Sequence, residues 1–190
     1  MITNKKELRK TLLTDFQRYP EFNKTHFSLR FFLDDRRKLL KVLRKLELFD
    51  YLFNSNKSYI YAPSYYFNLF RLNKLGHKIG VEIKKNTFGP GLYITHTGGI
   101  VVNGLASIGD NCTINAGVNI GNSQTANAVP QLGNNVWIGP GAKIFGKIVI
   151  ADGIAIGANA VVNKSFQEEN ISIAGVPAKK ISNNGSNKQI

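Results

Sequence analysis

Aliphatic residues recur at every sixth position through the middle and C-terminal parts of the chain. The series begins at Val102 and ends at Val162, and Ala126 interrupts it. A period of six fits neither a helix, which repeats every 3.6 residues, nor a flat strand, which repeats every two. The pattern therefore predicts a coil of hexapeptides, each forming one short face with its aliphatic side chain inside. The aliphatic positions are Val102, Ile108, Ile114, Ile120, Leu132, Ile138, Ile144, Ile150, Ile156 and Val162.

Small residues also hold fixed places in this repeat. Glycine or asparagine often follows the aliphatic residue, as at Gly109, Asn115 and Gly121. Both residue types tolerate a positive φ, so they let the backbone turn a corner. Three hexapeptides would close one triangular coil, and stacked coils would bury a continuous aliphatic column. The expected fold class is mainly β, a parallel β-helix of hexapeptide repeats.

The first 80 residues follow a different pattern. Apolar residues at helical spacing predict helices over residues 5–19, 28–49 and 63–76, the last capped by Gly76. These helices would cover the open end of the coils. The predicted organisation is an α-helical cap at 1–80, a β-helix at 81–181 with an external loop at 121–131, and a flexible tail at 182–190.

Charge and aromatic residues concentrate in this cap. The chain carries a formal net charge of +13, most of it before residue 91. Arg36, Arg37, Lys41 and Arg44 are expected on the solvent face of the second helix. A basic, aromatic-rich surface suits an anionic membrane, whereas nucleic acid binding is not expected. Peripheral contact with the inner face of the cell membrane is therefore a hypothesis.

The single cysteine and the first residues of the chain help to predict the cellular compartment of the protein. Cys112 falls on an inward repeat position, and one cysteine allows no disulfide within a chain. The chain opens with polar and charged residues rather than an apolar run, so a secretory signal is not expected. No apolar stretch is long enough to span a bilayer. We expect a cytoplasmic protein.

Three histidines are present, and one of them lies at the entry to the coils. His26 is expected in a linker and His77 just past a helix end. His96 stands close to Gly98 and Gly99, which permit a substrate to approach closely. A neutral imidazole there can act as a general base, an effect worth about 10²- to 10⁴-fold in rate. A metal centre is not expected, because the coil region offers no second histidine and no cysteine pair.

Several segments together resemble the serine acetyltransferase family of hexapeptide acyltransferases, and look closest to its polysaccharide O-acetyltransferase members. The resemblance covers roughly residues 60–181. It implies a left-handed β-helix, an acetyl-CoA-dependent O-acetyltransferase activity and a homotrimer. The segments that carry it are residues 82–83, 92–102, 137–144, 156–162 and 174–178.

The resemblance also implies roles for particular residues. His96 matches the general base, and Glu82 matches the carboxylate that orients it, although the family usually has aspartate there. Acetyl-CoA would lie in a groove between neighbouring β-helices of the trimer, with no metal, and Thr95 and Asn127 would face the acceptor. The residues expected along acetyl-CoA are Asn122, Gly139, Pro140, Ala158, Lys164 and Lys179.

Two departures from the family pattern bear on the acceptor. Serine-specific members have aspartate before the catalytic histidine and an Asp-Arg-His-Pro run in the loop, whereas this chain has Thr95 and the neutral residues 127–130. Losing such charges removes contacts to zwitterionic serine worth about 1.5–3 kcal/mol each. The favoured hypothesis is therefore acetylation of a sugar hydroxyl in surface polysaccharide (capsule, O-antigen or exopolysaccharide), on a small-molecule or lipid-linked acceptor.

Three alternatives remain open. The first is a serine O-acetyltransferase of cysteine biosynthesis. The second acetylates an amine on a nucleotide-activated sugar, although such proteins usually carry a different N-terminal domain. The third is a non-catalytic scaffold or nucleic-acid binder, for which His96→Ala should leave function intact.

Overall fold

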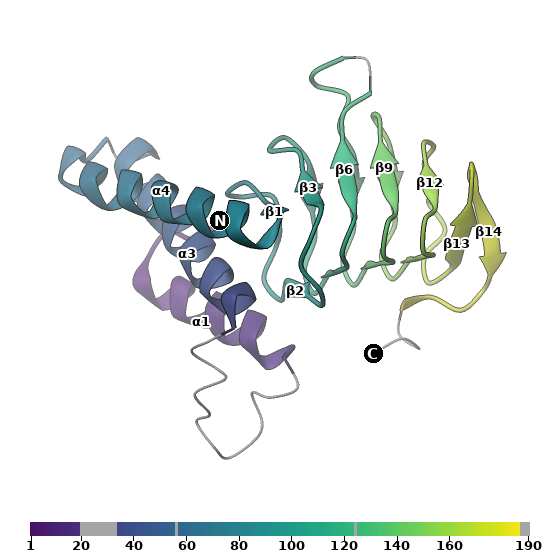
Figure 1. Cartoon of the computed structure of the whole chain (residues 1–190), viewed down its shortest axis with the longest axis horizontal. Coiled ribbons are helices and arrows are strands. Elements are labelled where there is room, and N and C mark those ends of the chain that lie inside the picture. Colours follow the sequence, from purple (N-terminus) through teal and green to yellow (C-terminus); the bar gives the residue numbers. More distant parts are fainter. Residues whose placement is uncertain (20–33, 56, 124, 187–190) are drawn as a thin grey trace.

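The computed structural model describes residues 1–19, 34–55, 57–123 and 125–186. Helices gather at one end of a triangular prism built from short strands (Figure 1). The predicted hexapeptide β-helix with an N-terminal helical cap is confirmed. His26 and residues 28–33 of the expected second helix lie outside the described residues.

Three α-helices form the described part of the cap, and each has a recognisable end. Asn4 caps the first helix by accepting hydrogen bonds from the N–H groups of Lys6 and Glu7, and Asp34 caps the second. The third helix ends at Gly80, which adopts φ 65° and donates its N–H to the carbonyl of Gly76. The helices are α1 (Lys5–Gln17), α3 (Asp35–Asp50) and α4 (Ala62–Ile79), with a π-helical turn (Tyr51–Ser55) and a 3-10 turn (Tyr59–Tyr61) between the last two.

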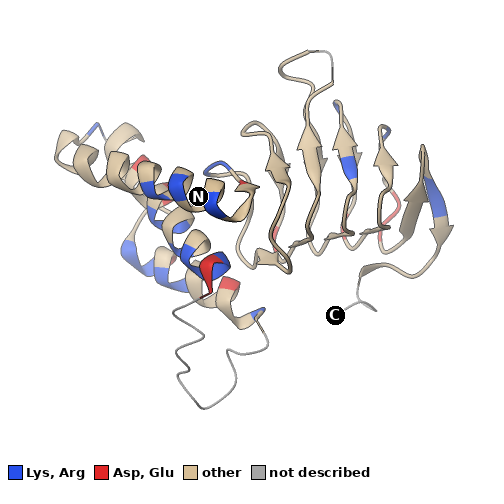
Figure 2. Ribbon diagram, viewed as in Figure 1, with Lys and Arg blue, Asp and Glu red and all other residues tan. Residues whose placement is uncertain are grey.

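Two expectations about the cap are wrong. Gly76 does not cap α4 but lies inside it, because the chain continues in helical geometry to the left-handed Gly80. The basic face of α3 is not all exposed either, since Arg37 is 4% and Arg44 1% exposed. The cap does carry much of the positive charge (Figure 2), but a membrane surface cannot reach these two arginines.

The strands form three parallel faces of the prism. The faces have strand orders β1-β3-β6-β9-β12, β10-β7-β4 and β14-β13-β11-β8-β5-β2. Among the described strands, only β13 and β14 pair antiparallel. The strands are β1 (Val81–Glu82), β2 (Tyr93–Ile94), β3 (Ile100–Val102), β4 (Ser107–Ile108), β5 (Thr113–Ile114), β6 (Asn119–Gly121), β7 (Gln131–Leu132), β8 (Trp137–Ile138), β9 (Lys143–Phe145), β10 (Val149–Ile150), β11 (Ala155–Ile156), β12 (Val161–Val162), β13 (Ser172–Gly175) and β14 (Ala178–Ser182).

The sixfold series fills the inside of the prism. Ile114 is paired with Ile94 on one side and Ile138 on the other, and Ile138 is paired in turn with Ile156. These four side chains are completely buried, as is Cys112. Because each aliphatic residue packs on the equivalent one above and below, burial is continuous along the axis.

Two edges of the prism matter for function. The turns that follow β2, β5, β8 and β11 stack along what we call the histidine edge, made of residues 95–99, 115–118, 139–142 and 157–160. Gly99, Gly117 and Gly141 turn this edge with φ of 64°, 73° and 74°, which an L side chain tolerates poorly. The turns that follow β3, β6, β9 and β12 stack along the next edge, the loop edge, where the segment after β6 protrudes (Figure 1).

A buried ionic cluster joins the helical cap to the first coil. Arg44 donates to Asp15 at 2.8 Å and Glu47 at 3.0 Å, and also to the carbonyls of Phe88 and Gly89. Burial lowers the pKa of Arg44, but the carboxylates of Glu47 and Asp15 outweigh it and hold that pKa above its usual value. The cluster therefore fixes α1 and α3 against the chain that leads into β2.

The far end of the chain packs back on the coils. Ser186 is buried; its N–H donates to the carbonyl of Gly153 at 2.9 Å and its hydroxyl to the carbonyl of Asn135. Within the described residues, the segment expected to be a flexible tail from residue 182 is thus anchored as far as Ser186. No helix among them is long and apolar enough to cross a membrane.

Candidate active site

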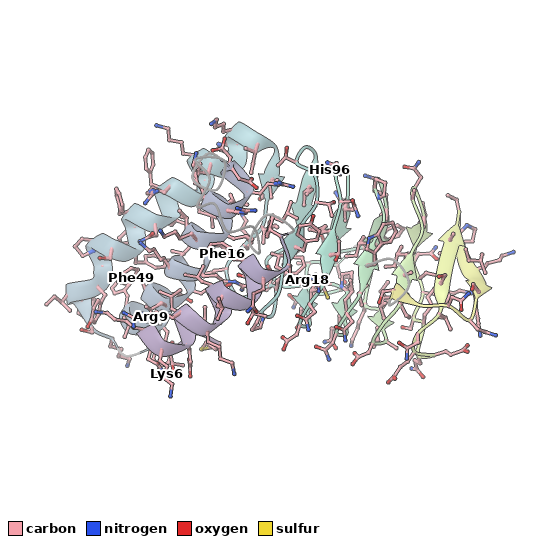
Figure 3. All side chains as sticks on the ribbon, turned by 90° about the horizontal axis from the view of Figure 1, so that it is seen from below. Lys6, Arg9, Phe16, Arg18, Phe49 and His96 are labelled. Carbon is pink, nitrogen blue, oxygen red and sulfur yellow. The ribbon has the colours of Figure 1, made fainter. Side chains whose placement is uncertain are left out.

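His96 lies in the first turn of the histidine edge, where the helical cap meets the coils (Figure 3). Its side chain is exposed and lines a hollow of about 450 Å³. The hollow is shared with Thr95 and Thr97 from the same turn and with the start of α3. An accessible imidazole beside an open cavity is what general-base chemistry on a small substrate requires.

Hydrogen bonds hold the backbone on which His96 sits. The N–H of Thr95 donates to the carbonyl of Ile114 at 3.1 Å, and its hydroxyl donates to the side-chain oxygen of Asn115. Asn115 is buried and donates in turn to the carbonyl of Ile138 at 2.9 Å. The Thr95 side chain is therefore bonded into the coil stack, and sequence reasoning did not foresee its partner Asn115.

Arg36 reaches the same turn from α3. Its Nε and Nη2 donate to the two oxygens of Asp34 at 3.0 and 2.9 Å, and its Nη1 donates to the carbonyl of Thr95. The hydrogen bonds to Asp34 raise the pKa of Arg36 above its usual value, so the guanidinium stays charged. Thr95, the residue before His96, is thus held by a fixed cation.

Asp35 places a negative charge in the same hollow. Its carboxylate accepts from Lys38 at 2.8 Å and from Lys78 at 2.6 Å. These hydrogen bonds lower the pKa of Asp35 below its usual value, so it is ionised at neutral pH. The hollow beside His96 therefore contains both signs of charge.

Glu82 stands on another face of the prism. It belongs to β1, where its partner in register is Val101, and its carboxylate pairs with Lys84 at 2.9 Å. No hydrogen bond joins Glu82 to His96 among the described residues, and Glu82 lines a separate hollow. The single chain does not bring these two predicted residues together.

Gly139, Pro140 and Ala158 do lie on the histidine edge with His96. Backbone hydrogen bonds connect the layers of this edge, including one of 2.9 Å from the N–H of Asn159 to the carbonyl of Pro140. A Cβ at Gly139 would lie 2.7 Å from the carbonyl oxygen of Ile156, so only glycine fits there. The edge is therefore a narrow track of small residues that leads away from His96.

The other predicted site residues lie elsewhere. Asn122 and Asn127 are exposed in the segment after β6, and Lys164 is exposed on the same loop edge, its ammonium 5.4 Å from the ring centre of Phe166. Lys179 is exposed on β14. In a single chain the face that contains β6 separates Asn122, Asn127 and Lys164 from His96.

Sequence reasoning missed the contribution of α3. Arg36 was expected on a solvent face, and Asp34 and Asp35 were not singled out. The only available signal was two acidic residues directly before two arginines at a helix start. His77, the other described histidine, is in the last turn of α4 rather than beyond it. No group of three or more His, Cys, Asp or Glu side chains that could hold a metal occurs within the described part of the chain.

A triangular β-helix with an exposed histidine above a stack of small-residue turns defines the class of hexapeptide-repeat acyltransferases. No protein-family model matches the sequence. A serine acetyltransferase of Helicobacter pylori strain J99 is 37% identical over 126 residues, which cover 64% of this chain and 73% of that protein. One from Synechococcus elongatus is 37% identical over 109 residues, 56% of this chain but only 44% of that relative's length. The chain belongs to the serine acetyltransferase family.

Solved structures agree with this family. The serine acetyltransferase of Brucella abortus aligns with a TM-score of 0.75 and 26% identity, covering 96% of this chain and 72% of that one. A Neisseria gonorrhoeae serine acetyltransferase in complex with serine aligns with a TM-score of 0.73 and 25% identity, covering 94% and 70%. The Brucella enzyme has also been solved in complex with coenzyme A, with a TM-score of 0.73 and 26% identity, covering 95% and 70%.

The expectation of a sugar acceptor in surface polysaccharide is wrong on these findings. The relatives and solved structures described above are named serine acetyltransferases, and the Neisseria structure is a complex with serine. The substitutions at Thr95 and Asn127 therefore do not by themselves indicate a different acceptor class.

Proposed function

We propose that this protein transfers the acetyl group of acetyl-CoA to the hydroxyl of L-serine, with His96 as general base. The observation that carries the proposal is the position of His96, exposed at the head of the small-residue edge and beside a hollow with both signs of charge. A zwitterionic acceptor suits such a hollow, because each charge of the acceptor can meet its opposite.

The reaction needs one base and no acyl-enzyme. The imidazole of His96 takes the proton of the serine hydroxyl, and the oxygen attacks the thioester carbonyl of acetyl-CoA. The tetrahedral intermediate collapses, the carbon–sulfur bond breaks, and the histidinium returns the proton to the departing thiolate. Free CoA and O-acetyl-L-serine leave the site.

Acetyl-CoA is proposed to lie along the histidine edge. Gly139, Ala158 and Pro140 leave room there for the pantetheine arm, since the first two have no side chain larger than methyl and the third has only its compact ring. Lys164 and Lys179 are exposed cations that could meet its phosphates, and the role of Asn122 stays a prediction. A neutral variant such as Lys179→Met would then raise the KM for acetyl-CoA without changing that for serine.

A homotrimer is part of the proposal. The loop edge and the histidine edge belong to different corners of one prism, so Asn127 and His96 could act on one acceptor only if they came from neighbouring chains. The outer surface of the intervening face carries the exposed Val101, an apolar residue suited to a contact between chains. The orienting role of Glu82 is proposed within the same assembly.

The proposal is tested by following thiol release from acetyl-CoA with and without L-serine. Serine should accelerate release in the wild-type protein. His96→Ala should lower kcat by at least about 10²-fold, the usual contribution of a general base, while the far-ultraviolet circular dichroism stays unchanged. Release that does not depend on serine, or a fully active His96→Ala variant, would contradict the proposal.

A further inference from the structure

The two coil positions predicted to face the acceptor carry neutral side chains in this protein. The hydroxyl of Thr95 donates a hydrogen bond to Asn115, and Asn127 lies on another edge of the prism. L-serine carries a carboxylate and an ammonium on one carbon, so its binding needs a cation and an anion near the catalytic base. Within the hollow that His96 lines, the charged side chains come from α3.

The guanidinium of Arg36 is held in one orientation by Asp34 and Thr95. Asp34 accepts from its Nε, its Nη2 and also its backbone N–H, at 3.0, 2.9 and 2.9 Å. The third nitrogen, Nη1, is fixed on the carbonyl of Thr95, next to His96. The side chain remains 25% exposed, and Nη2 has no second acceptor among the described residues. A fixed, planar guanidinium can bind a carboxylate without a large loss of side-chain entropy.

Asp35 offers the opposite charge one residue earlier. Its partners Lys38 and Lys78 have side chains that are 40% and 64% exposed. Ion pairs with such exposed lysines are weak, because water screens them. An arriving ammonium could therefore join or replace one of them at little cost.

We infer that Arg36 binds the carboxylate and Asp35 the ammonium of the acceptor, an assignment that rests on the proposed function. Asp34 is then a positioning residue, which acts by fixing Arg36. The helical cap would supply the two charges that the neutral side chains of Thr95 and Asn127 lack. On this account the cap is part of the active site as well as the cover of the β-helix.

Acceptor analogues test the inference without any mutation. At saturating acetyl-CoA, kcat/KM is compared for L-serine, for L-serinamide, which lacks the carboxylate, and for 3-hydroxypropionate, which lacks the ammonium. Each missing charge should lower kcat/KM by about tenfold to a hundredfold, the range for a charge-assisted contact. Equal use of serine and both analogues would overturn the inference while leaving serine acetylation intact.

Variants then assign each charge to its residue. Arg36→Gln keeps an amide donor for the Thr95 carbonyl but removes the cation, so the preference for serine over serinamide should largely vanish while activity on serinamide stays. In Asp35→Asn, the preference for serine over 3-hydroxypropionate should largely vanish, while activity on 3-hydroxypropionate stays. Arg71→Gln, an exposed arginine on α4 outside this hollow, should keep both preferences.

A structural role for Arg36 gives a different result. If Arg36→Gln lowered kcat/KM equally on serine and serinamide, the residue would only support the fold and the inference would fail. If Arg36→Gln did not fold, Arg36→Lys and the wild-type analogue series would decide, the lysine keeping part of the preference. A wild-type protein that acetylates none of the three acceptors would overturn the proposed function itself.

Discussion

Arg44 shows how one residue can hold two parts of this chain together. Its guanidinium meets Asp15 from α1, Glu47 from α3 and two carbonyls of the entry to the coils. Two buried carboxylates depend on it, so removing the cation leaves charge without compensation in a region shielded from water.

The stability of an Arg44→Met variant measures this cluster. Breaking a buried ion pair from one side usually costs about 3–5 kcal/mol, and we expect a loss of unfolding free energy in that range from urea denaturation. Arg71→Met, at an exposed position on α4, should change it by less than about 0.5 kcal/mol. Equal midpoints for both variants would show that the cluster does not stabilise the fold.

Cys112 illustrates the inside of the coil. Burial raises the pKa of its thiol to about 12, so the native protein should not react with a thiol reagent at pH 8 and should react once unfolded in guanidinium. An unfolded thiol ionises near pH 8.5. Between about pH 8.5 and 12 the thiol of Cys112 is therefore protonated in the native state and ionised in the unfolded state. Ionisation favours the unfolded state, so the contribution of Cys112 to the free energy of unfolding falls as the pH rises through this range. Rapid labelling of the native protein would contradict the described burial.

At the scale of elements, α4 and its junction with β1 are the instructive case. The sequence places a glycine at 76 and another at 80, and either could cap a helix. Only the structure shows why the first is glycine: a Cβ at Gly76 would lie 2.5 Å from the carbonyl oxygen of Val81. Close packing against the first residue of β1, rather than the end of a helix, requires glycine at position 76.

The Gly76→Ala substitution has two opposite effects on stability. Alanine favours a helix over glycine by about 1 kcal/mol, but the new methyl group would overlap a backbone atom that cannot move freely. We expect net destabilisation, read as a lower thermal midpoint. Asn73→Ala, an exposed site on the same helix, should raise the midpoint slightly. A Gly76→Ala variant more stable than the wild type would mean that the junction can relax.

Sequence reasoning succeeded where a pattern repeats and failed where contacts are non-local. The sixfold aliphatic series, the glycine turns and the prominent segment after β6 follow from spacing, because every coil repeats one local solution. The burial of Arg44 could not be read in this way, since it depends on Asp15 and on coil carbonyls far along the chain. Arg37 is buried against the ring of Tyr19, which is also not a neighbour in sequence. The same holds for the site: His96 was predicted beside its glycines, whereas Arg36 and Asp35 come to it through the docking of α3.

At the scale of the whole molecule, the proposed active site requires more than one chain. Complementation tests this directly. One variant carries His96→Ala; the other has residues 124–127 replaced by Gly-Gly, which spares the hydrogen bond from the Ser123 N–H to the Ala128 carbonyl at the base of the loop. Each alone should be impaired, the second through loss of Asn127.

Mixed trimers of the two variants should recover activity, because some interfaces pair an intact loop with an intact histidine. The measurement is serine-dependent thiol release after co-expression, compared with each variant expressed alone. A simple average of the two separate activities, in an assembly shown by light scattering to be trimeric, would place the whole site within one chain.

The most direct measurement of the central claim is identification of the product. The purified protein is incubated with acetyl-CoA and L-serine, and the mixture is analysed by mass spectrometry. The account predicts O-acetyl-L-serine formed in equal amount to free CoA, and almost none with His96→Ala. Release of CoA without O-acetyl-L-serine, or unchanged product from His96→Ala, would contradict it.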